Sequence, residues 1–262
     1  MSDEHKKFIK KLRIRIWITR TLQITLLILF IGLWEILARK QIIDPFITSS
    51  PSRVIKIISR LYRNKNLFNH IFATLYETVM GFVLSTVLGT LIAVLLWSSA
   101  MAKDVFQPYL ITLNALPKVA LGPIIIVWMG AGKPAIITMA LMICLIITII
   151  TMLTGFLEVD KEKLQLMKSM NANKLQTLFK LVLPANIPTL VSVLKINVGL
   201  SWVGTIMGEY LVSREGIGYL LVYGSQVFQL DLVMASTVIL CALAAVMYLC
   251  VAFLEKIIKK AF

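Results

Sequence analysis

Long apolar segments recur along this chain of 262 residues. Six can be drawn, over residues 16–38, 71–97, 105–129, 135–157, 188–212 and 231–254. Each is as long as the roughly 20 residues that a helix needs to cross a bilayer. Backbone groups inside hydrocarbon must bond within their own segment, so each span is predicted to be helical. With 58% hydrophobic residues and a mean hydropathy of +0.86, the chain is predicted to be an all-α polytopic membrane protein.

The formal charge of +14 is better explained by membrane orientation than by nucleic acid. Lys and Arg stand mostly at the ends of the apolar segments instead of forming one basic face. Six spans place both termini on one side, and the positive-inside rule favours a cytoplasmic N-terminus over residues 1–15 and a cytoplasmic C-terminus over 255–262. The first apolar segment is longer than the core of a signal peptide, so it is expected to remain as the first spanning helix.

The sequence offers little for catalysis. Cys144, Cys241 and Cys250 lie in apolar segments without CxxC spacing, and the two histidines, His5 and His70, stand far apart. No Gly-x-x-x-x-Gly-Lys-Ser/Thr phosphate loop occurs. We therefore expect a chain that is not an enzyme and binds no metal or cofactor itself.

Residues 39–70 are predicted to form an external segment that contains an amphipathic helix. Ser50 and Pro51 would supply its N-cap and first turn. Two sets of side chains oppose each other at helical spacing: Arg53, Lys56, Arg60 and Arg63 against Val54, Ile57, Ile58 and Leu61. The helix is either a solvated connector or a docking surface.

Two spans contain residues that interrupt helices or allow close packing. Pro117, Gly122 and Pro123 in the third span predict kinks beside a solute pathway, or else ordinary kinked packing. Gly204 and Gly208 in the fifth span form a GxxxG pair, which predicts a close helix contact within the subunit or across a dimer.

The polar loop over residues 158–187 is too long for a turn and is patterned as helix, break, helix. Asp160 is predicted to cap the first helix, with Leu164 and Met167 on its apolar edge. The pattern breaks at Asn171, and Asn173 with Gln176 predicts a second cap. The second helix is predicted to carry an apolar stripe and to end at Pro184. Its stripe comprises Leu175, Leu178, Phe179 and Val182.

The stretch "LQLMKSMNANKLQTLFKLVLPANIP" resembles the EAA loop of binding-protein-dependent ABC importer permeases. Four further stretches resemble the nitrate/sulfonate/taurine branch of that family: "LWEILAR", "LNALPKVALGPIIIVWMGAG", "LKINVGLSWVGTIMGEYL" and "EGIGYLL". Together they cover nearly the whole chain. In the EAA loop, Gln165, Leu166 and Met167 replace the Glu-Ala-Ala run and Asn171 replaces the Gly. Asn adopts left-handed backbone angles more readily than most residues, so the turn can survive.

The resemblance implies the MetI-like fold of type I importers, with a first helix over 16–38, a five-helix core over 71–254 and a cytoplasmic coupling helix pair. It also implies a second, identical permease subunit, two ATPases that hold ATP and Mg²⁺, and an external solute-binding protein, in a bacterial cell membrane. The residues expected to couple to the ATPase are Asp160, Leu164, Gln165, Leu166, Met167, Lys168, Ser169, Met170, Asn171, Ala172, Asn173 and Pro184.

Ionisable side chains inside spans are costly and usually face a cavity or a partner, and the candidates in this sequence are Glu77, Lys118, Lys195 and Glu209. Lys118, between Pro117 and Gly122, is the first candidate for lining the pathway. Glu209 either lines it, holds an outer gate or pairs across the bundle, while Lys195 and Glu35 are expected to snorkel. The remaining lining candidates are Asn114, Asn197, Ser201 and Trp202.

The resulting prediction is a permease that carries a small solute such as a sulfonate, taurine, nitrate or a thiamine precursor. The alternative is a secondary transporter or a membrane-complex subunit without an ATPase. Copurification of an ATPase would separate the two.

Overall fold

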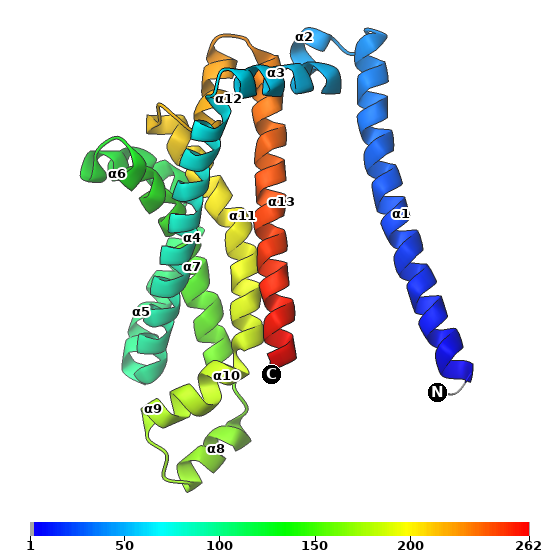
Figure 1. Ribbon diagram of the computed structural model, residues 1–262. Coiled ribbons are helices and arrows are strands. Elements are labelled where there is room, and N and C mark those ends of the chain that lie inside the picture. The colour runs from blue at the N-terminus through cyan, green and yellow to red at the C-terminus, as the bar shows by residue number, and fades with distance from the viewer. Residues whose placement is uncertain (1–2, 262) are drawn as a thin grey trace.

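The structure is a computed structural model that describes residues 3–261, which form helices joined by short turns (Figure 1). Among residues 3–261, five helices are long and apolar enough to cross a membrane. They are α1 (Asp3–Arg39), α4 (Leu67–Ser98), α7 (Lys133–Leu157), α11 (Ile187–Val212) and α13 (Leu230–Ala261). They confirm five of the six predicted spans, and α1 begins well before the predicted residue 16.

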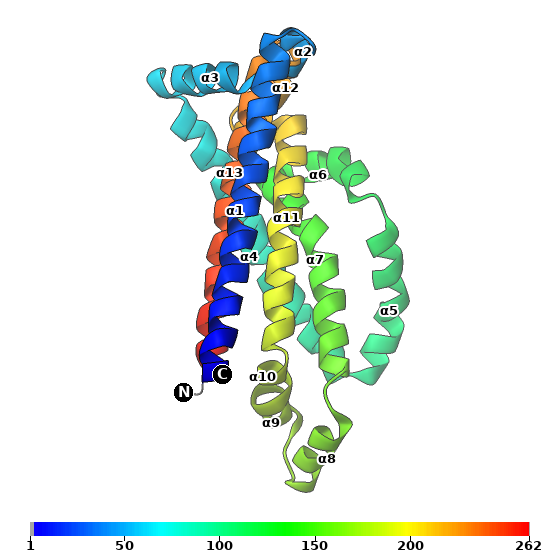
Figure 2. The same ribbon diagram turned by 90° about the vertical axis from the view of Figure 1, so that its right-hand side faces the viewer.

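The third predicted span is not one continuous helix. It consists of α5 (Ala100–Ala115), a 3₁₀ turn η1 (Lys118–Leu121) and α6 (Gly122–Met129), and the chain bends by 90° between α5 and the turn. Leu116 is extended, with ψ of 136°, because the residue before a proline avoids the helical region. Figure 2 shows α5 at the edge of the bundle, with α6 turned back toward it. Length and composition allow this pair to be a broken span or a re-entrant loop.

Helices α4, α7 and α11 form the centre of the bundle. A Cβ atom added to Gly204 would lie 2.4 Å from the Cα atom of Ala140 in α7, and one added to Gly208 would lie 2.9 Å from the Cα atom of Ile136. The GxxxG pair therefore packs α11 on α7 within the subunit. Small residues allow this approach in lipid, where backbone contact replaces the hydrophobic effect between helices.

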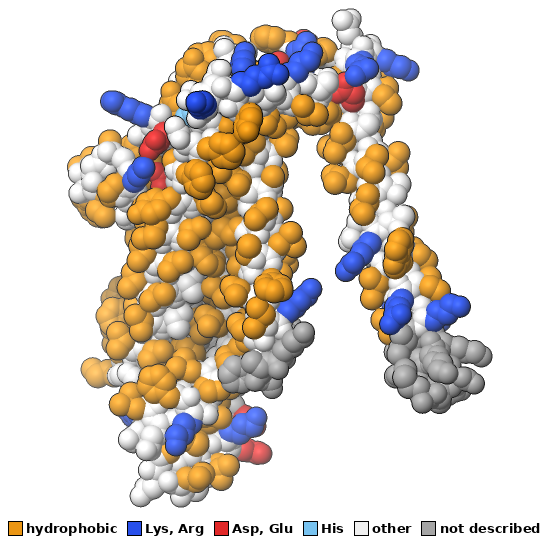
Figure 3. Space-filling view, viewed as in Figure 1, with side chains coloured by type: hydrophobic (Ala, Val, Ile, Leu, Met, Phe, Trp, Pro, Cys, Tyr) orange, Lys and Arg blue, Asp and Glu red, His pale blue; other side chains and the backbone are white. Residues whose placement is uncertain are grey.

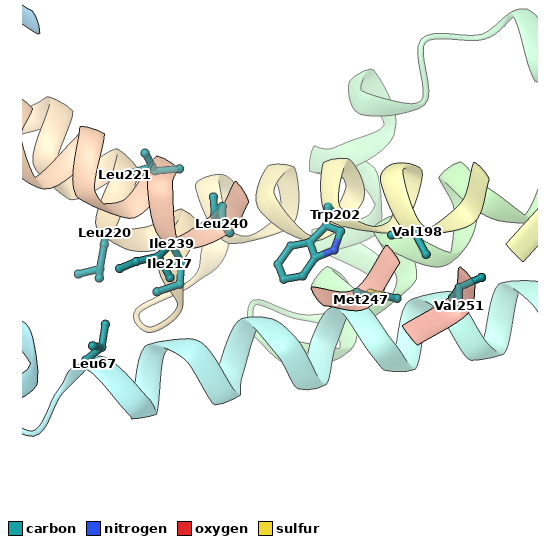
Figure 4. Close-up of a cluster of buried hydrophobic side chains, with 10 residues drawn as sticks. All are labelled: Leu67, Val198, Trp202, Ile217, Leu220, Leu221, Ile239, Leu240, Met247 and Val251. Atoms are coloured by element: carbon teal, nitrogen blue, oxygen red, sulfur yellow. The ribbon is translucent and has the colours of Figure 1, made fainter. Parts of the chain in front are cut away.

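The two larger of the three buried clusters found among residues 3–261 hold the bundle together. One joins α4, α11 and α13 to the short helix α12 (Ile217–Gln226) and includes Leu67, Trp202 and Ile217 (Figure 4). The other lies at the opposite end of the bundle, where Ala93 and Phe156 pack with residues that follow α7. The first cluster thus anchors α12 to the spans, and the second anchors the segment that follows α7.

Helix α1 stands apart from the bundle (Figures 1 and 3), and its apolar side chains are mostly exposed. Its C-terminal end contacts α2 (Pro45–Thr48) and α3 (Pro51–Arg63). The carboxylate of Glu35 accepts hydrogen bonds from the backbone N–H of Ser52 at 3.0 Å and from its hydroxyl at 2.9 Å. Glu35 therefore ties α1 to α3. The sequence had suggested that this side chain simply snorkels to the membrane surface.

Helix α3 matches the predicted amphipathic helix. The Ser50 hydroxyl accepts a hydrogen bond from the N–H of Arg53 at 3.4 Å, as expected of an N-cap. Val54 is buried, and Ile58 and Leu61 pack against the cluster of Figure 4. Lysine and arginine side chains gather along the outward face at this end of the molecule (Figure 3).

The described start of α1 and end of α13 lie at one end of the bundle (Figure 1). The polar helices between α7 and α11 lie at that same end, while α3 and α12 lie at the other. Near the first end, Lys195 forms an ion pair of 2.6 Å with Glu255, so this lysine has a partner within the subunit instead of snorkelling alone.

Candidate functional site

The polar segment between α7 and α11 begins with α8 (Lys161–Ser169). An Oδ1 oxygen of Asp160 accepts a hydrogen bond from the N–H of Glu162 at 2.9 Å, which confirms the predicted cap. Glu162 in the first turn and Lys168 in the last both complement the helix dipole. The helix is therefore defined at both ends by local sequence.

The turn after α8 depends on Asn171, whose φ is +58°. The N–H of Asn171 donates to the carbonyl of Lys168 at 2.9 Å, and the N–H of Ala172 donates to the carbonyl of Met167 at 3.0 Å. These bonds close the helix end around a left-handed residue. The left-handed conformation predicted for Asn171 is confirmed.

The second helical half begins at a capping box. The side chain of Asn173 accepts from the N–H of Gln176 at 2.8 Å, and the side chain of Gln176 accepts from the N–H of Asn173 at 2.9 Å. Three pieces follow without interruption: α9 (Lys174–Thr177), a π-helical turn η2 (Leu178–Val182) and α10 (Leu183–Ala185).

The prediction that Pro184 ends this helix is wrong, because Pro184 lies inside α10. In the preceding π turn the N–H of Leu183 bonds to the carbonyl of Leu178, five residues back. This wider turn makes room where a proline ring would otherwise meet the carbonyl four residues earlier. Helical backbone thus continues to Ala185, and α11 begins two residues later.

The predicted apolar stripe of the second half is divided between two faces. Leu178 and Val182 are buried beneath the segment, with Phe156 and Ala93 of the spans. Leu175 and Phe179 are 66% and 65% exposed, and on the other side of the turn Leu166 and Met170 are 60% and 70% exposed. These four residues, which we call the exposed apolar face, lie on an otherwise polar segment. Such a patch is typical of a protein contact surface.

The other residues predicted to couple lie on or beside this face. Leu164 and Met167, which were predicted to form the apolar edge of the first helix, are both half-buried. Asp160, Gln165, Lys168, Ser169, Asn171 and Asn173 are exposed, and Ala172 and Pro184 are half-buried.

The segment is also tied to the turn between α4 and α5. The Nζ atom of Lys174 donates to the carbonyl oxygen of Ser98 at 3.2 Å. A pocket of about 320 Å³ lies beside this bond, with Trp97, Leu164 and Lys168 in its walls. Contacts to α4, α5 and α7 therefore support the segment from the membrane side.

Two of the predicted pathway residues meet at the break in the third span. The Nζ atom of Lys118 lies 3.3 Å from both the carbonyl oxygen and the side-chain oxygen of Asn114. The side chain of Lys118 thus supplies a donor to a carbonyl at the C-terminal end of α5, where the chain leaves the helix. Asn114 is exposed and Lys118 half-buried, so both remain at the surface of the subunit.

The four other pathway candidates are on α11 and are buried within the subunit. Asn197 donates through Nδ2 to the hydroxyls of Thr86 at 3.1 Å and Thr148 at 2.8 Å, which ties α11 to α4 and α7. Ser201 and Trp202 are also enclosed, and Trp202 belongs to the cluster of Figure 4. A lining role for these residues stays a prediction, since this conformation closes them off.

Glu209 belongs to an arrangement that sequence reasoning missed. This arrangement of His70, Thr74 and Glu209 binds the N-terminus of α12, where Gly216 has no side chain to act as a cap. The N–H of Gly216 donates to Nδ1 of His70 at 2.9 Å, and the N–H of Ile217 donates to the hydroxyl of Thr74 at 2.7 Å. The N–H groups of Gly218 and Tyr219 donate to Oε2 of Glu209 at 2.5 and 3.3 Å.

The sequence signal for this arrangement was present in "EGIGYLL", where the start of a helix lacks a capping side chain. Gly216 has a φ of +110°, and an added Cβ atom would lie 2.4 Å from the carboxyl carbon of Glu209.

Among residues 3–261, no group of three His, Cys, Asp or Glu side chains is placed to hold a metal ion.

Residues 85–262 match the family described as the inner membrane component of binding-protein-dependent transport systems. A probable ABC transporter permease of Haemophilus influenzae is 29% identical over 82% of this chain and 87% of its own length. The formylaminopyrimidine transport permease of Halalkalibacterium halodurans is 28% identical over 71% of this chain and 74% of its own. An aliphatic sulfonates transport permease of Bacillus subtilis is 23% identical over 80% and 76%, respectively.

Solved transporters have the same fold. A chain of the MetNI methionine ABC transporter in an inward-facing conformation aligns with a TM-score of 0.67 at 17% identity, covering 76% of this chain and 98% of its own. A chain of a bacterial alginate ABC transporter aligns with a TM-score of 0.65 at 16% identity, covering 96% and 98%. With the family match spanning more than half of its length, this multi-pass chain belongs to the binding-protein-dependent transport permeases, as a transmembrane subunit of an ABC transporter.

Proposed function

We propose that the exposed apolar face of the α8–α10 segment docks on a separate ATPase and transmits its movement to the spans. The observation that carries this proposal is the exposure of Leu166, Met170, Leu175 and Phe179 outside the spanning helices. Full burial of a large apolar side chain is worth about 1.5–3 kcal/mol, so four of them offer substantial affinity to a complementary groove. We assign the binding of ATP and Mg²⁺ to the ATPase, since this sequence has no phosphate loop.

The α8–α10 segment also contacts α4 and α7, so a movement of the segment can be transmitted to these spans. Leu178 and Val182 are packed with Phe156 at the end of α7 and Ala93 in α4, and Lys174 holds the end of α4. A push on the exposed apolar face therefore reaches α4 and α7 through close-packed contacts. Packed interfaces change between discrete arrangements, which suits a switch between outward and inward access.

The assembly that we propose contains two copies of this chain, two ATPases and an external solute-binding protein. The isolation of α1 supports a second subunit, because a helix exposed on nearly all sides has room for a partner. The described ends of the chain lie on the side of α8–α10, which supports cytoplasmic termini in a bacterial cell membrane. In one related structure the alginate transporter is in complex with a periplasmic protein.

The solute is proposed to be a small metabolite, such as a sulfonate, taurine, nitrate or a thiamine precursor. Related permeases are named for the transport of aliphatic sulfonates, taurine and formylaminopyrimidine. Lys118 and Asn114 at the break in the third span are the proposed lining residues, because both are at the surface of the subunit beside a bend.

Copurification tests the docking surface. We expect the ATPase to copurify with the unaltered permease and to be lost when Leu166, Met170 and Phe179 are all changed to Glu. Each charge would have to be desolvated in the groove, so a loss of affinity well above tenfold is expected, at about 1.4 kcal/mol per factor of ten. The matched control is Phe228→Glu, since Phe228 is 72% exposed and lies beyond α12, at the other end of the molecule.

Retention of the ATPase by the triple variant would contradict the proposed surface. Copurification of no ATPase with the unaltered chain would also contradict the proposed docking.

A further inference from the structure

Two carboxyl groups meet inside the membrane-spanning bundle, near the end that carries α12. Glu77 of α4 is 0% exposed and Glu209 of α11 is 1% exposed. Gly81 of α4 and Gly204 of α11 both pack closely against Ala140 of α7, and Glu77 and Glu209 lie about one helical turn beyond these glycines toward α12, so both carboxyl groups lie at the same level between the helices. The docking function described above involves neither residue.

The surroundings of Glu209 favour its negative charge. Its Oε2 atom accepts hydrogen bonds from Gly218 and Tyr219, which are in the first turn of the ten-residue helix α12. Free N–H groups and the positive end of the dipole make a helix N-terminus a good place for an anion. The Oε1 atom of Glu209 is buried and receives no bond from an N–H group or a hydroxyl of the described chain.

The described surroundings of Glu77 give its negative charge no hydrogen bond, although Lys133 attracts it. Neither of its oxygens has a hydrogen-bond donor among residues 3–261, although both are buried. The nearby cation Lys133 forms an ion pair of 2.9 Å with Glu215. Other titratable groups around the two carboxyls are His70 and Tyr76 on α4, Tyr210 on α11 and Tyr219 on α12.

Two adjacent carboxylates cannot both stay charged in this place. Removing one carboxylate from water costs several kcal/mol, and a second like charge beside it adds repulsion. A carboxylate pair also has no hydrogen to share, whereas an acid beside a carboxylate forms a strong O–H···O⁻ bond. A single added proton removes one of the two buried charges and the repulsion between them, and it gives Oε1 of Glu209 a donor.

We propose that Glu77 and Glu209 form a proton-binding site in which Glu77 carries the proton and donates it to Oε1 of Glu209. The bound proton joins α4 to α11, and through Glu209 it joins both helices to the start of α12. Hydroxide removes the proton as water and leaves two buried negative charges between the helices. The site is thus a proton-dependent clamp on α12, and its existence does not depend on which solute or ATPase the chain works with.

Infrared spectroscopy of the purified permease tests the site directly. With glutamate labelled by carbon-13, the unaltered protein at neutral pH should show the isotope-shifted carbonyl band of a protonated carboxylic acid. The band should disappear in Glu77→Gln and persist in Glu158→Gln, because Glu158 is an exposed acid at the end of α7. Absence of the band from the unaltered protein, or its persistence in Glu77→Gln, would overturn the proposal.

Thermal unfolding in detergent supplies a second readout. The folded protein holds a proton that a solvated glutamate has lost at neutral pH, so stability should fall as the pH is raised until this proton leaves. Glutamine resembles the neutral acid and can still donate to Glu209, so Glu77→Gln should fold and lose the alkaline decline. An identical alkaline decline in the variant and the unaltered protein would count against the clamp. Should the variant not fold, the labelled spectrum of the unaltered protein decides alone.

Discussion

At the residue scale, single positions with unusual backbone angles shape both ends of the molecule. Asn171 has a φ of +58° and closes the turn between α8 and α9, and Gly216 has a φ of +110° at the start of α12. An L-residue with a side chain pays about 1–2 kcal/mol for left-handed angles, and least when it is Asn or Asp. Both turns are therefore sensitive to substitution.

Replacing Asn171 with Val should strain the turn by about 1–2 kcal/mol, because a β-branched side chain tolerates positive φ poorly. We expect severalfold weaker stimulation of ATP hydrolysis by solute in the reconstituted transporter, since α8 and α9 would lose their fixed angle. Asn171→Gly is the matched control and should retain coupling. Equal stimulation in the Val variant and the unaltered protein would show that the turn is not required.

Replacing Gly216 with Ala should destabilise the protein by more than the roughly 1–3 kcal/mol of backbone strain, because the new Cβ atom would meet the carboxyl group of Glu209. Gly130→Ala is the matched control: its φ is also positive, at +76°, but no atom lies within 4 Å of the added Cβ. Thermal unfolding in detergent should show the larger loss for Gly216. Equal losses would mean that the contact with Glu209 contributes nothing.

Residue roles could be predicted where they depend on neighbours in sequence. The caps at Asp160 and Asn173 and the turn at Asn171 were predictable, because each acts on backbone groups within four residues. The partners of Gly216 and Ile217 were not, because His70 and Thr74 are on a helix more than a hundred residues away. The burial of Asn197 likewise depends on which face of α11 meets Thr86 and Thr148.

At the element scale, hydropathy predicted the spans well and prolines were harder to interpret. Pro108 lies inside α5 without ending it, Pro117 marks the bend of 90°, and Pro184 lies inside a helix behind a π turn. A proline's effect depends on whether the preceding turn can widen or another donor can serve the freed carbonyl. Those conditions arise from tertiary contacts and do not follow from the position of the proline alone.

The packing of α11 on α7 gives a prediction at this scale. Gly204→Ala would place a methyl group 2.4 Å from the backbone of Ala140 and should destabilise the protein by about 1–3 kcal/mol. Gly199→Ala is the control on the same helix, where no atom lies within 4 Å, and it should be neutral or stabilising by up to about 1 kcal/mol. Thermal unfolding of the two variants in the same detergent measures the difference. A Gly204 variant as stable as the Gly199 variant would contradict this close approach.

At the scale of the whole molecule, the chain has the features of one part of a larger assembly. Helix α1 exposes apolar side chains on nearly all sides, and the α8–α10 segment exposes four more outside the spans. The apolar surface of α1 fits lipid or a second subunit, and the exposed apolar face of the α8–α10 segment fits a protein in water. The buried contacts of Leu178 and Val182 connect that second surface to the bundle.

Electron cryomicroscopy of the assembled transporter with its ATPase tests the central claim most directly. The account predicts that Leu166, Met170, Leu175 and Phe179 are enclosed in a groove of the ATPase, while α8 and α9 keep the turn at Asn171. An ATPase that contacts the permease elsewhere and leaves these four side chains in solvent would contradict it.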